Sequence, residues 1–333
     1  MRRLLANLHY DFIGRRRYAY AVTVALFLPG LVLLLIRGLN YGIEFTGGTL
    51  VQVEARQPVD IGAVRSALDA QGLDGAEIQR FGTDRDLVIR ARLPESGARR
   101  EDTGATSALV GTALDQVLGT GKYTVVRIEA VGPKVGGELR RKALTAILLS
   151  SLVILAYLAI RFEWRFGAAA VAATAHDVLG TSFFISVLNI EVSLVVVGAV
   201  LSVLGISLNE TIIIFDRVRE NERQKAPGTL AEVLNRSINE TLPRTVLTHG
   251  TALSTMLTLL LFGGEVIRPF ALVMFWGVST GIFSSMFIAP SVLMFIRRHW
   301  PLPGGARAGG PAAQPKDARR KPQPVGSGMA TSK

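Results

Sequence analysis

The sequence contains no cysteine and only four histidines among its 333 residues. Without cysteine the chain can form no disulfide, no thiolate metal site and no thiol nucleophile. The histidines are His9, His176, His249 and His299. No two of them have the spacing of a metal pair, and Gly-x-Ser-x-Gly does not occur. We therefore expect no catalytic residue, no metal and no cofactor.

A phosphate-binding loop is also missing. Gly119-Thr-Gly-Lys122 lacks the earlier glycine of such a loop, and Tyr123 stands where a serine or threonine is required. An ATP site is therefore not expected. An intramembrane hydrolase is equally disfavoured, because the sequence offers no nucleophile constellation.

Charged residues are scarce as well, at 19% of the chain, whereas hydrophobic residues make up 49% and the mean hydropathy is +0.35. The apolar residues gather in runs long enough to cross a bilayer, which takes about 20 helical residues. The first run follows three arginines and lacks a small-residue cleavage site, so we interpret it as an uncleaved anchor. The composition predicts a multi-pass α-helical membrane protein with six transmembrane helices at 18–36, 143–160, 166–188, 193–215, 245–262 and 270–296.

Positive charge is concentrated at the two ends of the chain. Residues 1–17 carry a net charge of +4 and residues 297–333 a net charge of +7, whereas 37–141 is balanced. Basic segments beside membrane helices stay cytoplasmic. Both termini and the 216–244 loop are therefore predicted to be cytoplasmic, and 37–141 to be outside. The 297–333 tail is rich in Pro, Gly and Ala, and we expect it to be disordered and attracted to membrane lipids rather than to a specific nucleic acid.

The segment 37–141 contains alternating strand and helix patterns. Apolar residues alternate in the strand-like stretches and recur at helical spacing in the others. The order β-α-β-β-α-β is that of a ferredoxin-like domain. The sequence thus predicts an inserted ferredoxin-like α+β extracytoplasmic domain with elements at 49–55, 59–71, 76–81, 86–93, 106–118 and 123–131.

Glycines flank this domain on both sides. Gly47 and Gly48 precede it, and Gly132 and Gly136 follow it. Glycine permits backbone conformations that other residues avoid. Two interpretations stay open at this point: tight turns, or hinges between a membrane base and a moving domain.

Ionisable residues occur within the predicted spans. Asp177 lies near the middle of the third span beside His176, and Glu210 lies in the fourth. A carboxylate at the bilayer centre costs roughly 3 kcal/mol, so it usually faces protein or water and has a function. Arg244 begins the fifth span, right after Pro243, and is the nearest counter-charge to Glu210 in sequence and depth; two orientations stay open for its side chain, snorkelling outward or turned inward. We predict a proton relay of these four residues, and a purely structural Glu210–Arg244 ion pair is the alternative.

Several short motifs resemble the SecD/SecF family of protein-export membrane proteins, which belongs with the proton-driven transporters of the resistance-nodulation-division type. Taken together, and in this order, the motifs are specific to that family. They are Tyr41-Gly-Ile-Glu-Phe-Thr-Gly-Gly-Thr49, Val131-Gly-Pro-Lys-Val-Gly-Gly-Glu-Leu139, Ala175-His-Asp-Val178, Ser207-Leu-Asn-Glu-Thr211, Phe215-Asp-Arg-Val-Arg-Glu-Asn221 and Thr241-Leu-Pro-Arg-Thr245.

The resemblance implies a location in the bacterial cytoplasmic (inner) membrane and a role in proton-driven protein translocation. It implies SecD as a partner, together with the SecYEG translocon, SecA and unfolded preproteins. It also places a proton-carrying carboxylate at Glu210, where the family usually has Asp, and an intramembrane arginine at Arg244. Two alternatives stay open: a small-molecule exporter of the same superfamily, and a passive assembly scaffold.

Overall fold

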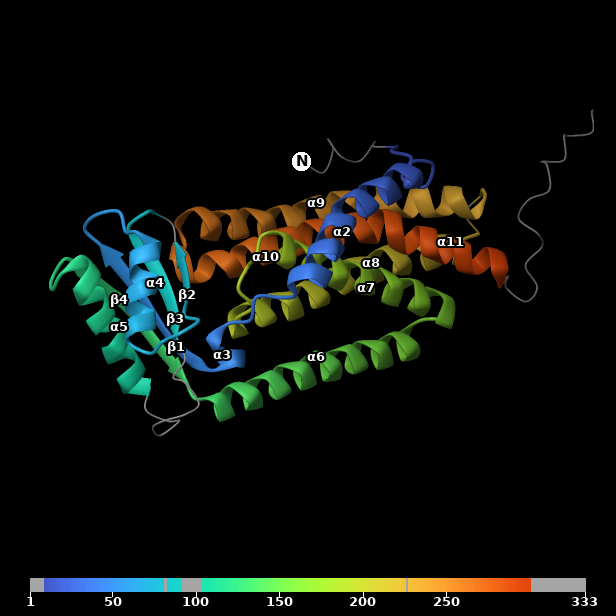
Figure 1. The fold of residues 1–333 in the computed structure, drawn as a ribbon. Helices are drawn as coiled ribbons and strands as arrows, with labels where there is room; N and C mark the ends of the chain where they lie inside the picture. The colour runs from blue at the N-terminus through green and yellow to red at the C-terminus, as the bar shows by residue number, and fades with distance from the viewer. Residues whose placement is uncertain (1–8, 81–82, 92–102, 226, 301–333) are drawn as a thin grey trace, which may run out of the picture.

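The computed structural model describes residues 9–80, 83–91, 103–225 and 227–300. The predicted disordered tail lies outside the described residues beyond Trp300, as does most of the N-terminal arm. Within the described part, six helical segments are long and apolar enough to cross a membrane, which confirms the predicted multi-pass class. They are α2 (Arg16–Arg37), α6 (Pro133–Arg161), α7 (Trp164–Val187), α8 (Leu194–Arg223), α9 (Leu230–Phe262) and a last span made of α10 (Gly264–Phe283), η1 (Ser284–Ile288) and α11 (Ala289–His299) (Figure 1).

The 216–244 segment differs from the predicted loop, because most of it is helix. α8 continues to Arg223, and α9 begins at Leu230. The Thr229 side chain accepts a hydrogen bond from the Glu232 amide, and the Glu232 carboxylate accepts one from the Thr229 amide. This capping box starts the helix well before Pro243, which lies inside α9 instead of marking its beginning. Only 224–229 connect the two helices.

The last span contains a π-helical turn, η1, which the sequence reading did not predict. Its backbone bond runs from the Ala289 amide to the Ser284 carbonyl, five residues back. Pro290 follows directly and has no amide hydrogen to donate to the preceding turn. A widened turn at this point is therefore consistent with the sequence, and π turns are often found at functional sites.

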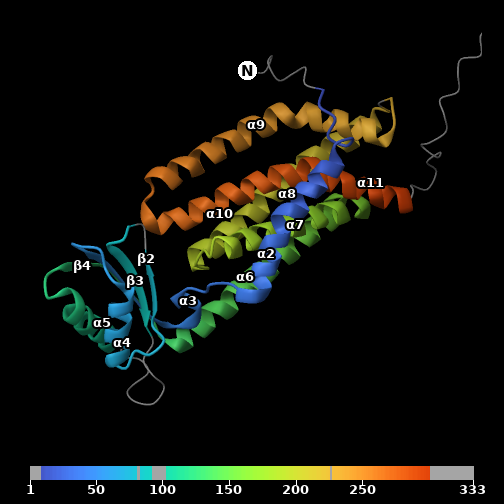
Figure 2. The same ribbon diagram turned by 45° about the horizontal axis from the view of Figure 1, so that its top comes forward.

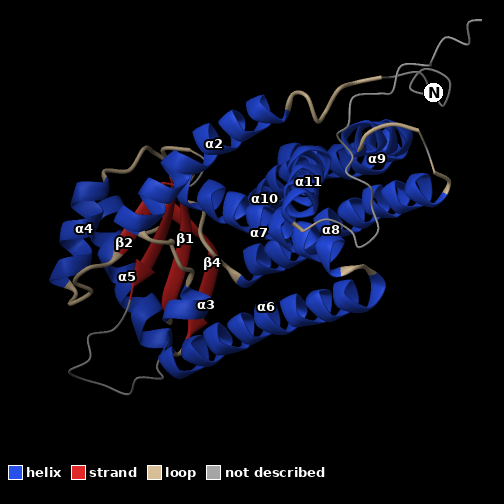
Figure 3. Cartoon of the chain, turned by 90° about the vertical axis from the view of Figure 1, so that its right-hand side faces the viewer, coloured by secondary structure: helices blue, strands red, loops and turns tan. Residues whose placement is uncertain are grey.

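The helices form a bundle in which α7, α8 and the last span hold most of the buried side chains. Buried residues are sparse on α2, α6 and α9. Figure 2 and the end-on view in Figure 3 place α6 and α9 on opposite sides of the bundle. The three outer helices therefore expose long apolar faces, as expected of segments that contact lipid or a partner protein.

The remaining elements form a separate sheet domain, residues 48–131. The strand order is β2-β3-β1-β4 with every pair antiparallel, which confirms the predicted ferredoxin-like fold. Helices α4 and α5 cover one face of the sheet (Figures 1 and 3), and fully buried Val53, Leu87, Val64 and Leu114 are part of the core between them. The elements are β1 (Gly48–Ala55), α4 (Ile61–Ala70), β2 (Glu77–Arg80), β3 (Asp86–Ala91), α5 (Thr103–Leu118) and β4 (Tyr123–Val131). The predicted ends at 81 and 92–93 lie outside the described residues.

The four glycines proposed as hinges occupy the connections between this domain and the helices. A short helix that was not predicted, α3 (Ile43–Thr46), ends at Gly47, which has a φ of 72°, and Gly48 follows with a φ of 126°. A Cβ on Gly136 would lie 3.0 Å from the Gly47 amide nitrogen. Backbone conformation and close packing therefore account for Gly47, Gly48 and Gly136. A Cβ on Gly132, in contrast, would meet no other atom within 4 Å. Their hinge role stays a prediction.

A polar junction fixes the sheet domain to the helix bundle. Arg90 of β3 is ion-paired with Glu191, which lies in the 188–193 loop between α7 and α8. The Asn40 side chain also accepts from Arg90. The backbone is bonded here too, since the Gly42 amide donates to the Val192 carbonyl at 2.9 Å and the Val192 amide donates to the Asn40 carbonyl at 2.7 Å. The loop between two membrane helices thus holds the domain in place.

Burial at this junction raises the pKa of Glu191, and the nearby Glu44 raises it further, although Arg90 opposes the shift. Undocking the domain would expose Glu191 and return its pKa towards the ordinary value, about 4.3. The docked form therefore binds a proton more tightly than the undocked form. Protonation favours docking, and this contribution is lost as pH rises through the raised pKa.

We expect docking of the sheet domain to weaken as pH rises from about 4.3 through the raised pKa of Glu191. Spin labels on cysteines introduced at Ser66 and Leu188 would report the distance between the domain and the bundle. The distance distribution should broaden with rising pH in the otherwise unchanged chain and become independent of pH with Glu191→Gln. Asp84→Asn, at the distant end of the sheet, is the control and should retain the dependence. A pH dependence that survives Glu191→Gln would contradict the assignment.

Candidate proton site between the membrane helices

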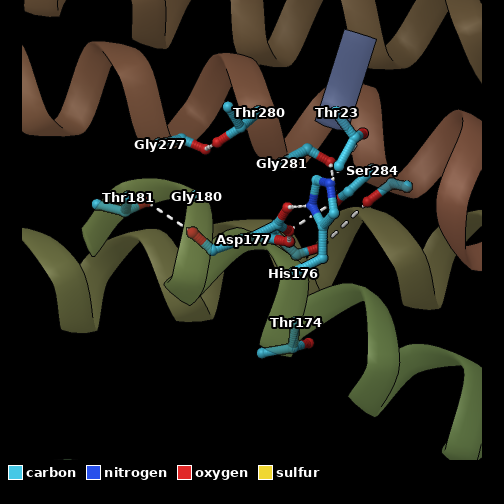
Figure 4. Close-up of polar contacts among 12 residues, drawn as sticks. Thr23, Thr174, His176, Asp177, Gly180, Thr181, Gly277, Thr280, Gly281 and Ser284 are labelled. Atoms are coloured by element: carbon cyan, nitrogen blue, oxygen red, sulfur yellow. Dashed lines mark hydrogen bonds and ion pairs between the residues drawn. The ribbon is translucent and has the colours of Figure 1, made fainter. Parts of the chain in front are cut away.

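Asp177 lies on α7 with its carboxylate surrounded by three helical elements. It is fully buried. The Ser207 hydroxyl of α8 donates to Asp177 Oδ2, and Ser284 Oγ of η1 lies 2.6 Å from the same oxygen. His176 Nδ1 lies 3.0 Å from Asp177 Oδ1 (Figure 4). Two hydroxyls and an imidazole therefore replace the water that a carboxylate would have outside the membrane.

His176 extends this cluster to α2. Its Nε2 lies 3.2 Å from Thr23 Oγ1, and its ring centroid is 4.6 Å from that of Phe27. A Cβ on Gly180 would lie 2.6 Å from the Phe27 ring, so the glycine lets α2 approach α7 closely. The sequence-predicted pair of His176 and Asp177 is thus brought together in the structure, in contact with four elements.

Glu210 forms a second cluster, between α8 and α9. Its side chain is 2% exposed. The Thr245 hydroxyl donates to Glu210 Oε1, and His249 Nε2 lies 2.9 Å from Glu210 Oε2. Thr241, Thr245 and His249 are buried and recur every four residues, so they share one face of α9.

Arg244 does not contact Glu210, and the predicted ion pair is wrong. Arg244 precedes Thr245 by one residue, about 100° around the helix, and it is exposed. Within the described part of the chain it makes no hydrogen bond or ion pair. The residue that the sequence reading missed is His249. The four-residue spacing of Thr241, Thr245 and His249 is the sequence signal that indicates this residue. Residues with that spacing share one face of a helix, here the buried face, whereas Arg244 lies on another face.

The two clusters contain the same kinds of polar groups. Each carboxyl group faces one imidazole and one or more hydroxyls, and in the described ranges neither contacts a lysine or arginine. A carboxyl–imidazole pair can hold a proton on either group. The described residues also contain no group of three or more His, Cys, Asp or Glu arranged for a metal ion. The clusters are therefore candidate proton sites.

Comparison with known proteins decides the family. Residues 110–299 match the family model "Protein export membrane protein SecD/SecF, C-terminal", and residues 32–59 match the "SecD/SecF GG Motif". The chain belongs to the SecD/SecF family. This confirms the resemblance seen in the sequence. The first SecD/SecF match contains both carboxyl clusters, and the second contains Gly47 and Gly48.

Individual relatives agree with this assignment. The chain is 52% identical to the protein translocase subunit SecF of Gemmatimonas aurantiaca over 305 residues, which are 90% of this chain and 91% of that one. It is 38% identical to the SecF subunit of Escherichia coli O157:H7 over 288 residues, 86% of this chain and 87% of that one. The chain is thus similar to SecF subunits over nearly their whole length.

Solved structures show the same fold in a longer protein. SecDF of Thermus thermophilus, a translocon-associated membrane protein, superimposes with a TM-score of 0.78 at 34% identity. The match covers 88% of this chain but 39% of that one. SecDF in a super-membrane-facing form gives a TM-score of 0.63 over the same shares. This chain therefore spans about two fifths of the length of SecDF.

We expect His249→Leu to destabilise the purified chain, because among the described residues it leaves the buried Glu210 carboxyl with the Thr245 hydroxyl as its remaining partner. Removing one partner of a buried hydrogen bond costs about 1–3 kcal/mol. Thermal unfolding in detergent would measure the loss. Thr248→Val changes the exposed neighbouring residue and should have little effect. Equal stability of His249→Leu and Thr248→Val would contradict the contact.

Proposed function

We propose that this chain is a subunit of the Sec protein-export machinery. Paired with SecD, it uses the proton motive force to promote late steps of preprotein translocation across the cytoplasmic membrane. The observation that carries the proposal is the buried Glu210 carboxyl, hydrogen-bonded to His249, in a chain of the SecD/SecF family. The other partners that we propose are the SecYEG translocon, SecA and unfolded preproteins.

Glu210 is the proposed proton carrier. Burial between α8 and α9 makes its charge costly, so its protonation state and the packing around it are linked. Moving one charge across the membrane supplies about 2.3 kcal/mol per 100 mV. His176 and Asp177 are proposed as a second part of the relay. Arg244, which is exposed on α9, is not included in this relay.

The sheet domain is the proposed site of contact with the translocating chain. β4 is an edge strand that pairs with β1 alone among the described strands, and its Val125, Val126 and Ile128 are exposed. An exposed strand edge can accept an extended peptide through backbone hydrogen bonds. Weak binding of unfolded polypeptide is therefore proposed for this edge, on the outer side of the membrane.

The proposal requires both termini in the cytoplasm and the sheet domain outside. A cysteine introduced at Ser66, which is exposed on α4, should react with an impermeant maleimide added to spheroplasts, in which the inner membrane is still sealed. A cysteine at Gln224, between α8 and α9, should react only after permeabilisation. The chain has no native cysteine to interfere. Labelling of Ser66→Cys from the cytoplasmic side alone would overturn the orientation.

We expect Glu210→Gln to assemble with its partners but to lose the stimulation of export by the proton gradient, because a glutamine side chain cannot ionise and so cannot bind and release a proton. Glu210→Asp should retain a fraction of the stimulation. The measurement is the export rate of a model preprotein with and without an uncoupler, normalised to the amount of assembled complex.

The same experiment separates the alternative of a passive scaffold. A scaffold predicts that Glu210→Gln lowers the yield of complex, while the assembled fraction still responds to the uncoupler. A normal uncoupler-sensitive response in Glu210→Gln would remove Glu210 from the mechanism. Ser279→Ala is the control for substitutions in this region and should leave activity unchanged, because among the described residues the Ser279 hydroxyl bonds the Phe275 carbonyl of its own helix alone.

A further inference from the structure

The π-helical turn η1 buries two consecutive hydroxyls. Ser284 and Ser285 are both fully buried. In a regular α-helix neighbouring side chains diverge by about 100°. The wider π turn carries one extra residue and allows both to face the bundle interior. A paired serine at this point therefore reaches two partners on different helices.

The two serines contact different carboxyl-bearing helices, Ser284 at Asp177 of α7 and Ser285 at Thr211 of α8. Ser284 donates to Asp177. Ser285 Oγ lies 2.8 Å from Thr211 Oγ1, and Thr211 directly follows Glu210 on α8. Ser285 also donates to the Ser207 carbonyl at 3.4 Å. Because the Ser207 hydroxyl donates to Asp177, Ser207 is bonded both to the Asp177 cluster and to Ser285.

We propose that Ser284, Ser285 and Thr211 are positioning residues that couple Asp177 to Glu210, so that the two carboxyl groups bind protons as a linked pair. The proposal rests on the proposed role of Glu210 as a proton carrier. The ionisable group that faces Asp177 is His176, and the one that faces Glu210 is His249. No other charged side chain contacts either carboxyl group in the described ranges. The Ser284 hydroxyl bonds Asp177, and the neighbouring Ser285 hydroxyl bonds Thr211, which the α8 backbone joins to Glu210.

The coupling follows from the hydrogen bonds of Asp177. As an anion it accepts from both Ser207 and Ser284 at Oδ2. When a proton binds Asp177 Oδ2, that oxygen loses one of the two acceptor positions that the hydroxyls share, so one hydroxyl turns away. Ser284 has a second acceptor within reach, the Gly281 carbonyl at 3.1 Å. Its rotation alters η1, and with it the position of Ser285 against Thr211.

Thr211 offers the cleanest test, because its hydroxyl does not contact either carboxyl group in the described residues. Thr211→Val removes the hydroxyl and retains the shape, whereas Thr211→Ser retains the hydroxyl. Infrared spectroscopy of the full chain, purified with its partner subunit, would follow carboxyl protonation against pH. The band that Asp177→Asn removes identifies Asp177.

We expect Glu210→Gln to move the pH midpoint of the Asp177 band by about half a pH unit or more in the wild-type and Thr211→Ser backgrounds. In the Thr211→Val background that movement should be lost. Ser285→Ala should behave like Thr211→Val, and Ser279→Ala like the wild type.

An equal movement in the Thr211→Val background, or none in the wild type, would overturn the proposal. The infrared measurement needs no export, so its outcome is separate from that of the uncoupler experiment. If the bands are coupled while Glu210→Gln still exports normally, the proposed function fails and the coupling stands. If export depends on Glu210 without coupled bands, the reverse holds.

Discussion

The burial of two carboxyl groups between membrane helices is the constraint on which the rest of the structure depends. Neither Asp177 nor Glu210 can reach bulk water, so the helices must supply hydrogen-bond donors. Close approach makes this possible: a Cβ on Gly281 would lie 3.0 Å from that of Ser207, and a Cβ on Gly277 would lie 2.3 Å from Val203. The small residues of the last span thus bring η1 and α8 close enough for Ser207 and Ser284 to share one carboxylate oxygen.

The same helices are connected to the sheet domain. α7 carries Asp177, α8 carries Glu210, and the loop that joins them holds Glu191 and Val192 against the domain. A shift of α7 relative to α8 must therefore displace the loop to which β3 is ion-paired. A short covalent path thus joins the helices that carry the two carboxyl groups to the contact with the sheet domain, without a long chain of side-chain contacts.

The sequence predicted the elements whose signal is local, and it failed where partners come from distant positions. The six spans and the β-α-β-β-α-β order follow from hydropathy and periodicity. The extension of α9 was missed because Pro243 was taken as a boundary, whereas the capping box at Thr229 determines the start. η1 has no reliable sequence signal. The Glu210–Arg244 pairing used proximity in sequence and depth, but helical rotation directs Arg244 outward and His249 inward.

The partner beside Glu210 is a histidine, His249, where the sequence had suggested an arginine. This difference changes the charge that the membrane interior must accommodate. A carboxyl group beside a permanently charged guanidinium would alternate between a neutral pair and a cationic one. A carboxyl group beside a neutral imidazole would instead form either an anionic or a neutral pair. In such a pair the anionic form is the costly one, and in the structure the Thr245 hydroxyl donates to Glu210 Oε1. Glutamate also has the longer side chain, and this reach lets a carboxyl group anchored on α8 accept from both Thr245 and His249 on α9. Glu210, Thr245 and His249 therefore form one hydrogen-bonded unit, in which the length of the acidic side chain allows it to reach two partners on the facing helix.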